Sequence, residues 1–394
     1  MSGSEPSSGV EELFHLRRGR MSRVAEHFGV VRNGKWIVWR MIVGSVLITW
    51  VPLVLLAMIQ GVAWGPRVDT TPLLKDFLPY GRYFLAVPIL IAAEWIVGRR
   101  LGLALAELRR TASVDKDASA KIDAAVGRAL VLWRGPYVMA FLVTAVYGMT
   151  LATVFAGTGV AAGTWESTPG AGSSAPSLAG LWQLVVSAPL LRLLTFRWLW
   201  RWLIWAWVLW RTAHVSIRVS PMHPDGAGGL GFLGSAQTGF ATLVLAVSVQ
   251  VGSLVANTVE YRGAQLANYQ GQAVLFVILS LVFVFAPLLV FTARLALAKW
   301  EAESSLSGWA SRAERSMEQG LREDDTAKPL SESSISSLCD YGTLFTQARQ
   351  MRLIPVSNRD LAVVVAAALL PAVPLLFVAM PATEILQKIL SALI

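Results

Sequence analysis

Long apolar runs separated by short polar connections dominate the pattern of this 394-residue chain. A membrane-crossing helix needs about 20 mostly apolar residues to span roughly 30 Å of hydrocarbon. The pattern therefore predicts an all-α fold, a polytopic α-helical membrane protein with about seven transmembrane helices. The expected spans are Met41–Ile59, Tyr83–Gly98, Tyr137–Val160, a segment starting near Leu181, Gly239–Ala256, Ala273–Ala293 and Leu361–Met380.

Two of these spans are unusual. The second is short and carries Glu94, which makes it the weakest of the seven. The fourth continues to Ala213 without a glycine or a turn cluster, and as one helix it would be roughly 50 Å long. That length exceeds the hydrocarbon thickness, so we expect this helix to tilt strongly or to run on into the headgroups.

The distribution of Lys and Arg predicts the orientation. Of 34 such residues, 26 lie in the N-terminal tail and in connections 99–134, 211–218 and 294–359, whereas 5 lie on the other side. This alternation follows the positive-inside rule and places the N-terminus in the cytoplasm of a bacterial cytoplasmic (inner) membrane. The composition agrees, with 55% apolar and 15% charged residues. The net charge of +9 is thus a topology signal, and no nucleic-acid partner is expected.

The spans divide the chain into four parts. We expect a basic amphipathic cytoplasmic segment (1–35), a six-span bundle (36–293) that includes a cytoplasmic helical connection (99–134) and a Gly-rich loop (220–234), a cytoplasmic helical region (294–359), and a last span with an outer interfacial tail (360–394). The single cysteine, Cys339, excludes an intrachain disulfide and a cysteine-based zinc cluster. No cofactor is expected.

The fourth span carries an arginine and tryptophan cluster, "LLRLLTFRWLWRWLIWAWVLWRTAH". Arg197 and Arg201 share one helix face, whereas Arg192 points largely away from Arg201. One interpretation is an anion-attracting patch, because guanidinium groups bind phosphate and carboxylate. The alternative is that the helix leaves the hydrocarbon near Arg197, so that tryptophan lies in the headgroup belt and arginine snorkels.

Glu94 is the only carboxylate inside a predicted span. An unpaired charge at that depth is costly, so one hypothesis pairs it with Arg197 or Arg201. The other hypothesis is local, with Glu94 reaching the inner interface beside Arg99 and Arg100.

The loop "SPMHPDGAGGLGFLG" precedes the fifth span. Its GxGxxG spacing lacks the strand that a dinucleotide site requires, and its HPD tripeptide lacks the soluble hairpin of a J-domain. The glycines permit an amide nest at a helix start, which favours anions. The alternative is a tight capped turn, and no metal site is expected. The candidate anion-binding residues here are His223, Asp225, Gly226, Gly228, Gly229 and Gly231.

The stretch "HPDGAGGLGFL" and the later "MRLIPVSNRDLAVVVAAALLPAVPLLF" carry a resemblance. The second half of the chain resembles a family of uncharacterised bacterial multi-pass inner-membrane proteins with an HPDxxGGLGFL-type loop. The resemblance implies membrane location and a multi-pass architecture, and it carries no activity.

Three functions remain open from the sequence. The leading hypothesis is a channel or transporter for a small, anionic solute, because charges inside a polytopic bundle often mark pathways. The alternative is a membrane scaffold or sensor that binds a cytoplasmic partner through 99–134 and 294–359. A lipid-modifying enzyme ranks third, because no nucleophile–base constellation is present. The expected partners are the lipid bilayer and anionic lipid headgroups or a small anion, and a homo-oligomer is considered.

Overall fold

The computed structural model describes residues 34–64, 71–112, 116–134, 136–161, 163–168, 175–215, 217, 219–323 and 332–375. The predicted amphipathic segment up to residue 33, the break at 324–331 and the outer tail from residue 376 lie outside this part of the chain. Within it, helices dominate, and the only β-structure is two isolated bridges. The all-α prediction is confirmed.

Seven helical segments form the membrane bundle, and α6 and α14 accompany them. Their bounds are α3 Gly34–Ile59; α4 Phe77–Pro79, η3 Tyr80–Ala86 and α5 Val87–Ala112; α6 Lys116–Arg134; α7 Pro136–Phe155; α8 Leu178–Trp182, η4 Gln183–Ser187 and α9 Ala188–Ala213; α10 Gly231–Gln237, η5 Thr238–Phe240 and α11 Ala241–Arg262; η6 Leu266–Tyr269, α12 Gln270–Phe285, η7 Ala286–Phe291 and α13 Thr292–Glu323; α14 Glu332–Gln350; and α15 Asn358–Leu369 with η8 Leu370–Ala372.

Six helices in the described residues are long and apolar enough to cross a membrane, and they coincide with six of the seven predicted spans. They are Val38–Ile59, Pro136–Phe155, Leu178–Ala213, Gly231–Arg262, Leu266–Arg312 and Asn358–Leu375. The second predicted span is not among them. It lies within the helical segment α4–η3–α5.

Contacts between connections show that α4–η3–α5 nevertheless passes through the bundle. The backbone N–H of Trp165 donates to the carbonyl of Thr71 at 3.0 Å, and its indole Nε1 donates to Asp76 Oδ2 at 2.8 Å. The connections before α4 and after α7 therefore lie at the same end of the bundle. An even number of crossings must separate them, so α7 crosses together with α4–η3–α5. This gives seven passes.

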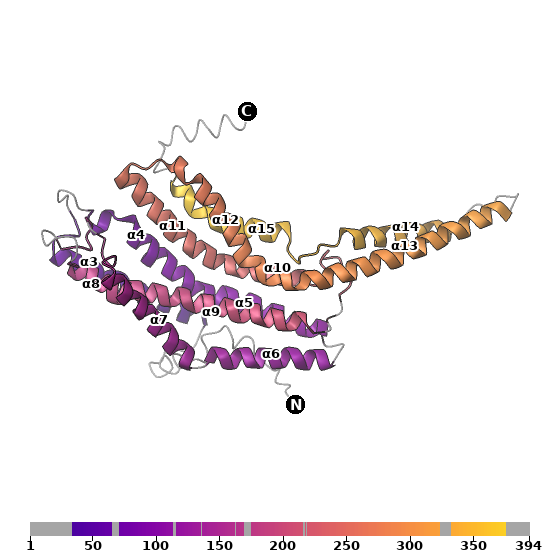
Figure 1. The fold of residues 1–394 in the computed structure, drawn as a ribbon, viewed down its shortest axis with the longest axis horizontal. Coiled ribbons are helices and arrows are strands. Elements are labelled where there is room, and N and C mark those ends of the chain that lie inside the picture. The colour runs from indigo at the N-terminus through magenta and orange to yellow at the C-terminus, as the bar shows by residue number, and fades with distance from the viewer. Residues whose placement is uncertain are drawn as a thin grey trace.

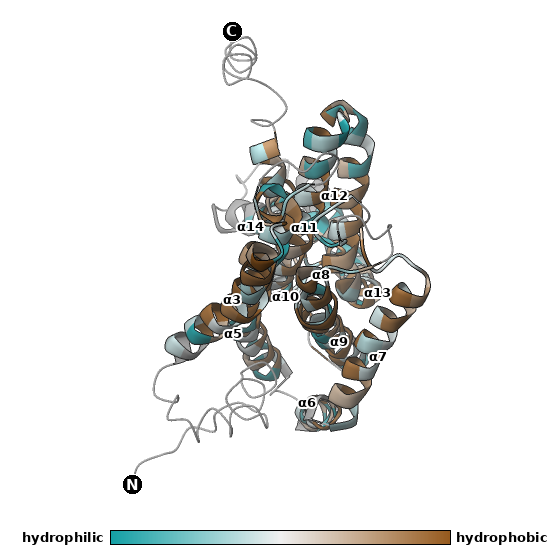
Figure 2. Ribbon diagram, turned by 90° about the vertical axis from the view of Figure 1, so that its left-hand side faces the viewer, coloured by the Kyte–Doolittle hydropathy of each residue, from teal (hydrophilic) through white to brown (hydrophobic). Residues whose placement is uncertain are grey.

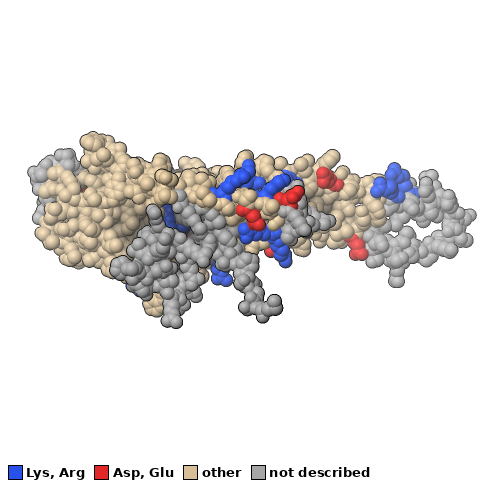
Figure 3. Space-filling view, turned by 90° about the horizontal axis from the view of Figure 1, so that it is seen from below, with Lys and Arg blue, Asp and Glu red and all other residues tan. Residues whose placement is uncertain are grey.

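The molecule is elongated along the helix axes (Figure 1). The connections between α3 and α4 and between α7 and α8 lie at one end, and the paired helices α13 and α14 project beyond the bundle at the other. Apolar residues cover α3 and α9 (Figure 2). Figure 3 shows Lys, Arg, Asp and Glu gathered over the middle of the molecule and along the hairpin, and none at the opposite end of the face in view.

Prolines explain where the helices depart from α-helical geometry. The π-helical turns η3 and η4 each end two residues before a proline, Pro88 and Pro189. Pro287 and Pro371 lie inside the 3₁₀ segments η7 and η8. Proline lacks an N–H and clashes with the carbonyl four residues earlier, so the preceding turn widens or tightens.

The predicted fourth span is one helical segment of 36 residues, α8–η4–α9, about 54 Å long. Helix α6 packs against α9, and both Ile122 of α6 and Leu209 of α9 are fully buried. The excess length of the fourth span is thus covered by the protein itself.

Candidate functional site

A buried ion cluster joins α5 to α9. Glu94 Oε1 lies 2.8 Å from Arg197 Nη2 and 3.3 Å from Arg201 Nη1. Glu94 is 4% exposed and Arg201 is 2% exposed. The hypothesis that Glu94 pairs with Arg197 or Arg201 is confirmed, and one oxygen serves both. Among the described residues, two guanidinium groups face this one carboxylate, which gives these three side chains an excess positive charge.

The side chains of Trp198 and Trp202, which lie on one face of α9, point towards the protein interior. Trp198 Nε1 donates to the Leu90 carbonyl at 2.8 Å, and the Arg201 guanidinium lies 4.8 Å from the Trp198 ring centroid. Trp202 Nε1 donates to the Phe283 carbonyl at 3.1 Å. Neighbouring helices therefore cover this part of α9, and its depth in the membrane stays a prediction.

A second polar region lies farther from the hairpin, on the same two helices. Arg82 of η3 and Arg192 of α9 line a cavity of about 310 Å³. Arg192 Nη1 donates to Thr150 Oγ1 of α7 at 2.9 Å. Neither arginine has a carboxylate within ion-pair distance among the described residues. Arg192 is one of the predicted anion-binding residues, whereas Arg82 was predicted to lie in the connection before the second span.

The other walls of the cavity are polar on one side and apolar on the other. Tyr83, Thr195 and Gln250 supply polar groups. Tyr83 is fully buried, and its hydroxyl has no hydrogen-bond partner among the described residues. The apolar lining comes from Met149, Ala188, Leu191 and Phe196.

Local backbone features bring Arg82 to this cavity. It lies in the π-helical turn η3, and the second π-helical turn, η4, ends immediately before the lining residue Ala188. Next to Arg82, a Cβ on Gly81 would lie 1.8 Å from Ser253 Oγ of α11. Only glycine permits this close approach of η3 to α11, which carries Gln250. Such π-helical turns recur at functional sites, so they are a signal that a sequence pattern alone does not reveal.

Polar side chains continue from the ion cluster towards the hairpin end. Gln237 is fully buried, accepts from Trp205 Nε1 at 2.7 Å and donates to the Val284 carbonyl at 2.6 Å. Arg100 donates to Thr238 Oγ1. The bundle therefore holds three successive polar regions, namely the arginine cavity, the ion cluster, and the glutamine and arginine contacts.

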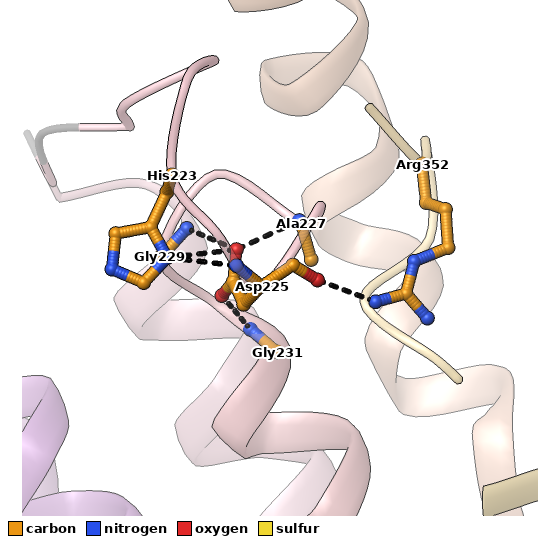
Figure 4. Close-up of polar contacts among 6 residues, drawn as sticks. All are labelled: His223, Asp225, Ala227, Gly229, Gly231 and Arg352. Carbon is orange, nitrogen blue, oxygen red and sulfur yellow. Dashed lines mark hydrogen bonds and ion pairs between the residues drawn. The ribbon is translucent and has the colours of Figure 1, made fainter. Parts of the chain in front are cut away.

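The Gly-rich loop folds around one carboxylate (Figure 4). Asp225 Oδ1 accepts from the N–H groups of Ala227 at 2.8 Å and Gly229 at 3.1 Å, and Oδ2 accepts from Gly231 N–H at 2.8 Å. His223 Nδ1 lies 2.9 Å from Oδ1. Burial alone raises the pKa of Asp225, but these hydrogen bonds outweigh it and hold the pKa below its usual value. The chain's own carboxylate occupies the amide nest, which favours the capped-turn alternative over an anion site.

The same loop is fixed to the segment that leads into α15. Arg352 Nη2 donates to the Asp225 carbonyl at 2.6 Å, and the Arg352 N–H donates to the Gly226 carbonyl at 2.8 Å. Gly228 has φ +67°, and a Cβ there would lie 2.4 Å from Val219. A Cβ on Gly234 would lie 2.2 Å from the Pro355 carbonyl oxygen. These glycines serve close packing and turn geometry.

No group of three His, Cys, Asp or Glu side chains suited to a metal ion occurs in the described part of the chain. Comparison of the chain with family models, with curated proteins and with solved structures gives no match. The fold and the sites therefore define the class as a multi-pass α-helical membrane protein, and the geometry above is what bears on its activity.

Proposed function

We propose that the protein is a channel or transporter for a small anion in the bacterial inner membrane. The observation that supports this most is the buried cluster of Glu94 with Arg197 and Arg201 inside the bundle. A buried ion set with excess positive charge is expensive in a membrane and commonly marks a solute path. Arg82 and Arg192 add two further cations along the same helices, so the path favours anions.

The test is anion flux in vesicles that contain the purified full chain. Chloride, nitrate, benzoate and phosphate are offered in turn, and counter-ion movement is made free by a potassium ionophore. We expect at least one anion to exceed its flux in protein-free vesicles, and Arg197→Gln to reduce that flux about ten-fold or more. This variant retains the Glu94–Arg201 pair, which keeps the helices together while the cluster loses its excess charge.

A matched control is Arg109→Gln. Arg109 pairs with Asp123 at 2.7 Å on the part of the protein beyond the spans, and both side chains are partly exposed. Flux should be unchanged in this variant. Absence of flux for every anion, with the protein shown to be folded and inserted, would contradict the proposal.

The scaffold alternative has its own supporting feature, the projecting hairpin of α13 and α14 (Figure 1). Trp309 and Tyr341 stack across it with ring centroids 3.5 Å apart. A rigid hairpin beyond the bundle suits a cytoplasmic partner. Under this alternative, a soluble protein copurifies in stoichiometric amount, deletion of 300–350 releases it, and the vesicles show no anion flux.

A further inference from the structure

We propose that the cavity between η3, α7, α9 and α11 binds a small organic carboxylate, with Arg82 and Arg192 holding the carboxylate group. This inference rests on the proposed function in one respect only, namely that the bound carboxylate is also the transported solute. Binding itself is a separate property of the folded protein.

The charge of the cavity calls for an anion. Arg82 and Arg192 both line it, and no carboxylate among the described residues lies within ion-pair distance of either. Burial raises the pKa of Glu166, and Arg82 lies close enough for its positive charge to oppose that rise, but Glu166 does not pair with Arg82 directly. A guanidinium inside a membrane bundle normally has a partner or faces water, because its isolated charge is costly there. An anionic ligand in the cavity supplies that partner, and guanidinium groups match the planar geometry of a carboxylate.

The polar groups beside the arginines are few, which limits the ligand. Thr195 and Gln250 line the cavity, and both already donate to backbone carbonyls of their own helices. Tyr83 is fully buried, and its hydroxyl is not accessible from the cavity, so the two guanidinium groups are the main donors for a ligand. A single carboxylate suits this donor set. A phosphate or sulfate ion carries more oxygens and more hydration to replace.

The remaining lining selects an apolar body for the ligand. Met149, Leu191 and Phe196 contribute thioether, aliphatic and aromatic surface. Binding pockets for small molecules combine such surface with a few polar groups that fix orientation. The volume of about 310 Å³ is at the small end of such pockets. A short aliphatic or single-ring acid fits this description, whereas the two acyl chains of a lipid exceed it.

The outer connection lies close to this region. Glu166 accepts from Gln183 Nε2 in η4, and its second oxygen accepts from the Ala161 N–H at 2.9 Å. A Cβ on Gly180 would lie 2.2 Å from the Glu166 carbonyl oxygen, so the connection is packed directly on α8. This contact fixes η4, and with it the start of α9, against the outer end of the bundle.

In the experiment, each probe is titrated into the purified full chain in detergent, and binding is measured by calorimetry. The probes are benzoate, hexanoate, inorganic phosphate and the neutral isostere benzamide. We expect benzoate and hexanoate to bind, and phosphate and benzamide to bind at least ten-fold more weakly. Arg82→Gln and Arg192→Gln should each weaken benzoate binding about ten-fold to a hundred-fold, because a hydrogen bond to a charged group is lost.

Arg262→Gln is the matched control, because Arg262 is exposed at the end of α11, and it should leave binding unchanged. A longer acid, palmitate, separates a small solute from a lipid. If affinity rises steadily from hexanoate to palmitate, the site is a lipid groove and the inference is wrong. Equal binding of phosphate and benzoate, or full benzoate affinity in both arginine variants, also overturns it.

Failure of this inference and failure of the proposed function give different results. Anion flux without carboxylate binding rejects the carboxylate site and leaves transport standing. Carboxylate binding that needs Arg82 and Arg192, in vesicles without flux, rejects transport and leaves the binding site standing. Should Arg192→Gln fold poorly because its bond to Thr150 is lost, Arg192→Lys retains the charge and should keep part of the affinity.

Discussion

Replacing Glu94 by glutamine should destabilise the bundle more than replacing either arginine that it contacts. The same carboxylate oxygen lies 2.8 Å from Arg197 Nη2 and 3.3 Å from Arg201 Nη1. Glu94→Gln removes the negative charge that these two neighbouring cations share, and one of them is 2% exposed. Removing one partner of a buried ion pair costs about 3–5 kcal/mol.

Arg197→Gln leaves a neutral pair, Glu94 with Arg201, so its cost is mainly one hydrogen bond to a charged group. That loss is about 1.5–3 kcal/mol. We therefore expect Glu94→Gln to lower the free energy of unfolding by about 2 kcal/mol more than Arg197→Gln. The double variant Glu94→Gln with Arg197→Gln should lose less free energy of unfolding than the sum of the two single variants, because both substitutions remove the same contact.

The measurement is the free energy of unfolding in mixed detergent micelles, followed by tryptophan fluorescence. Glu107→Gln serves as the control, since Glu107 pairs with the exposed Arg110 at 2.8 Å and such a pair contributes at most about 1 kcal/mol. A second arm exchanges the charges, with Glu94→Arg and Arg197→Glu together. Two results would refute the reasoning. One is an equal loss of unfolding free energy in Glu94→Gln and Arg197→Gln. The other is a charge-exchanged protein that is no more stable than Glu94→Arg or Arg197→Glu alone.

Two further predictions concern the Gly-rich loop. Asp225→Ala should cost about 1–2 kcal/mol, as loss of a capping carboxylate does. Because the folded-state pKa of Asp225 is lowered, its contribution is complete above the unfolded-state value of about 3.9 and is lost as pH falls through the folded-state pKa. Between pH 6 and pH 3, the free energy of unfolding should therefore fall less in the variant than in the unmodified protein. Gly234→Ala should destabilise the protein strongly, because the new Cβ would lie 2.2 Å from the Pro355 carbonyl oxygen. Gly271→Ala is the control, because a Cβ there meets open space. Equal thermal stability of the two variants would contradict the packing argument.

The spans could be predicted because apolar runs in this chain are long and the basic residues alternate between the two sides. The pairing of Glu94 could be proposed for a related reason, since a charge among apolar helices needs a partner, but the sequence left the local alternative beside Arg99 and Arg100 equally open. The burial of Trp198 and Arg201 could not be predicted, because a stripe on one helix does not show whether a neighbour or the headgroups cover it. Only the contacts of α9 with α5 and α6 decide this.

Arg82 marks a different limit of sequence reasoning. It lies five residues after the start of α4, where a basic residue normally belongs to the interface. Its place in the cavity depends on the π-helical turn η3, which precedes Pro88, and on the fit of Gly81 against Ser253, which arises from tertiary packing. The role of Gly234 is likewise non-local, since the atom it avoids belongs to Pro355, far along the chain.

If the proposed path is passive, the membrane potential sets the direction of flux through it. Among the described residues, Arg197 and Arg201 contact Glu94, and Arg82 and Arg192 line a separate cavity on the same helices. This arrangement lowers the barrier for an anion and raises it for a cation. A membrane potential that is negative inside acts on the permeating charge by about 2.3 kcal/mol for each 100 mV, which corresponds to roughly 50-fold in concentration at equilibrium. Without coupling to another solute, such a path releases anions from the cell, so flux in oriented vesicles should follow the imposed potential and reverse with it.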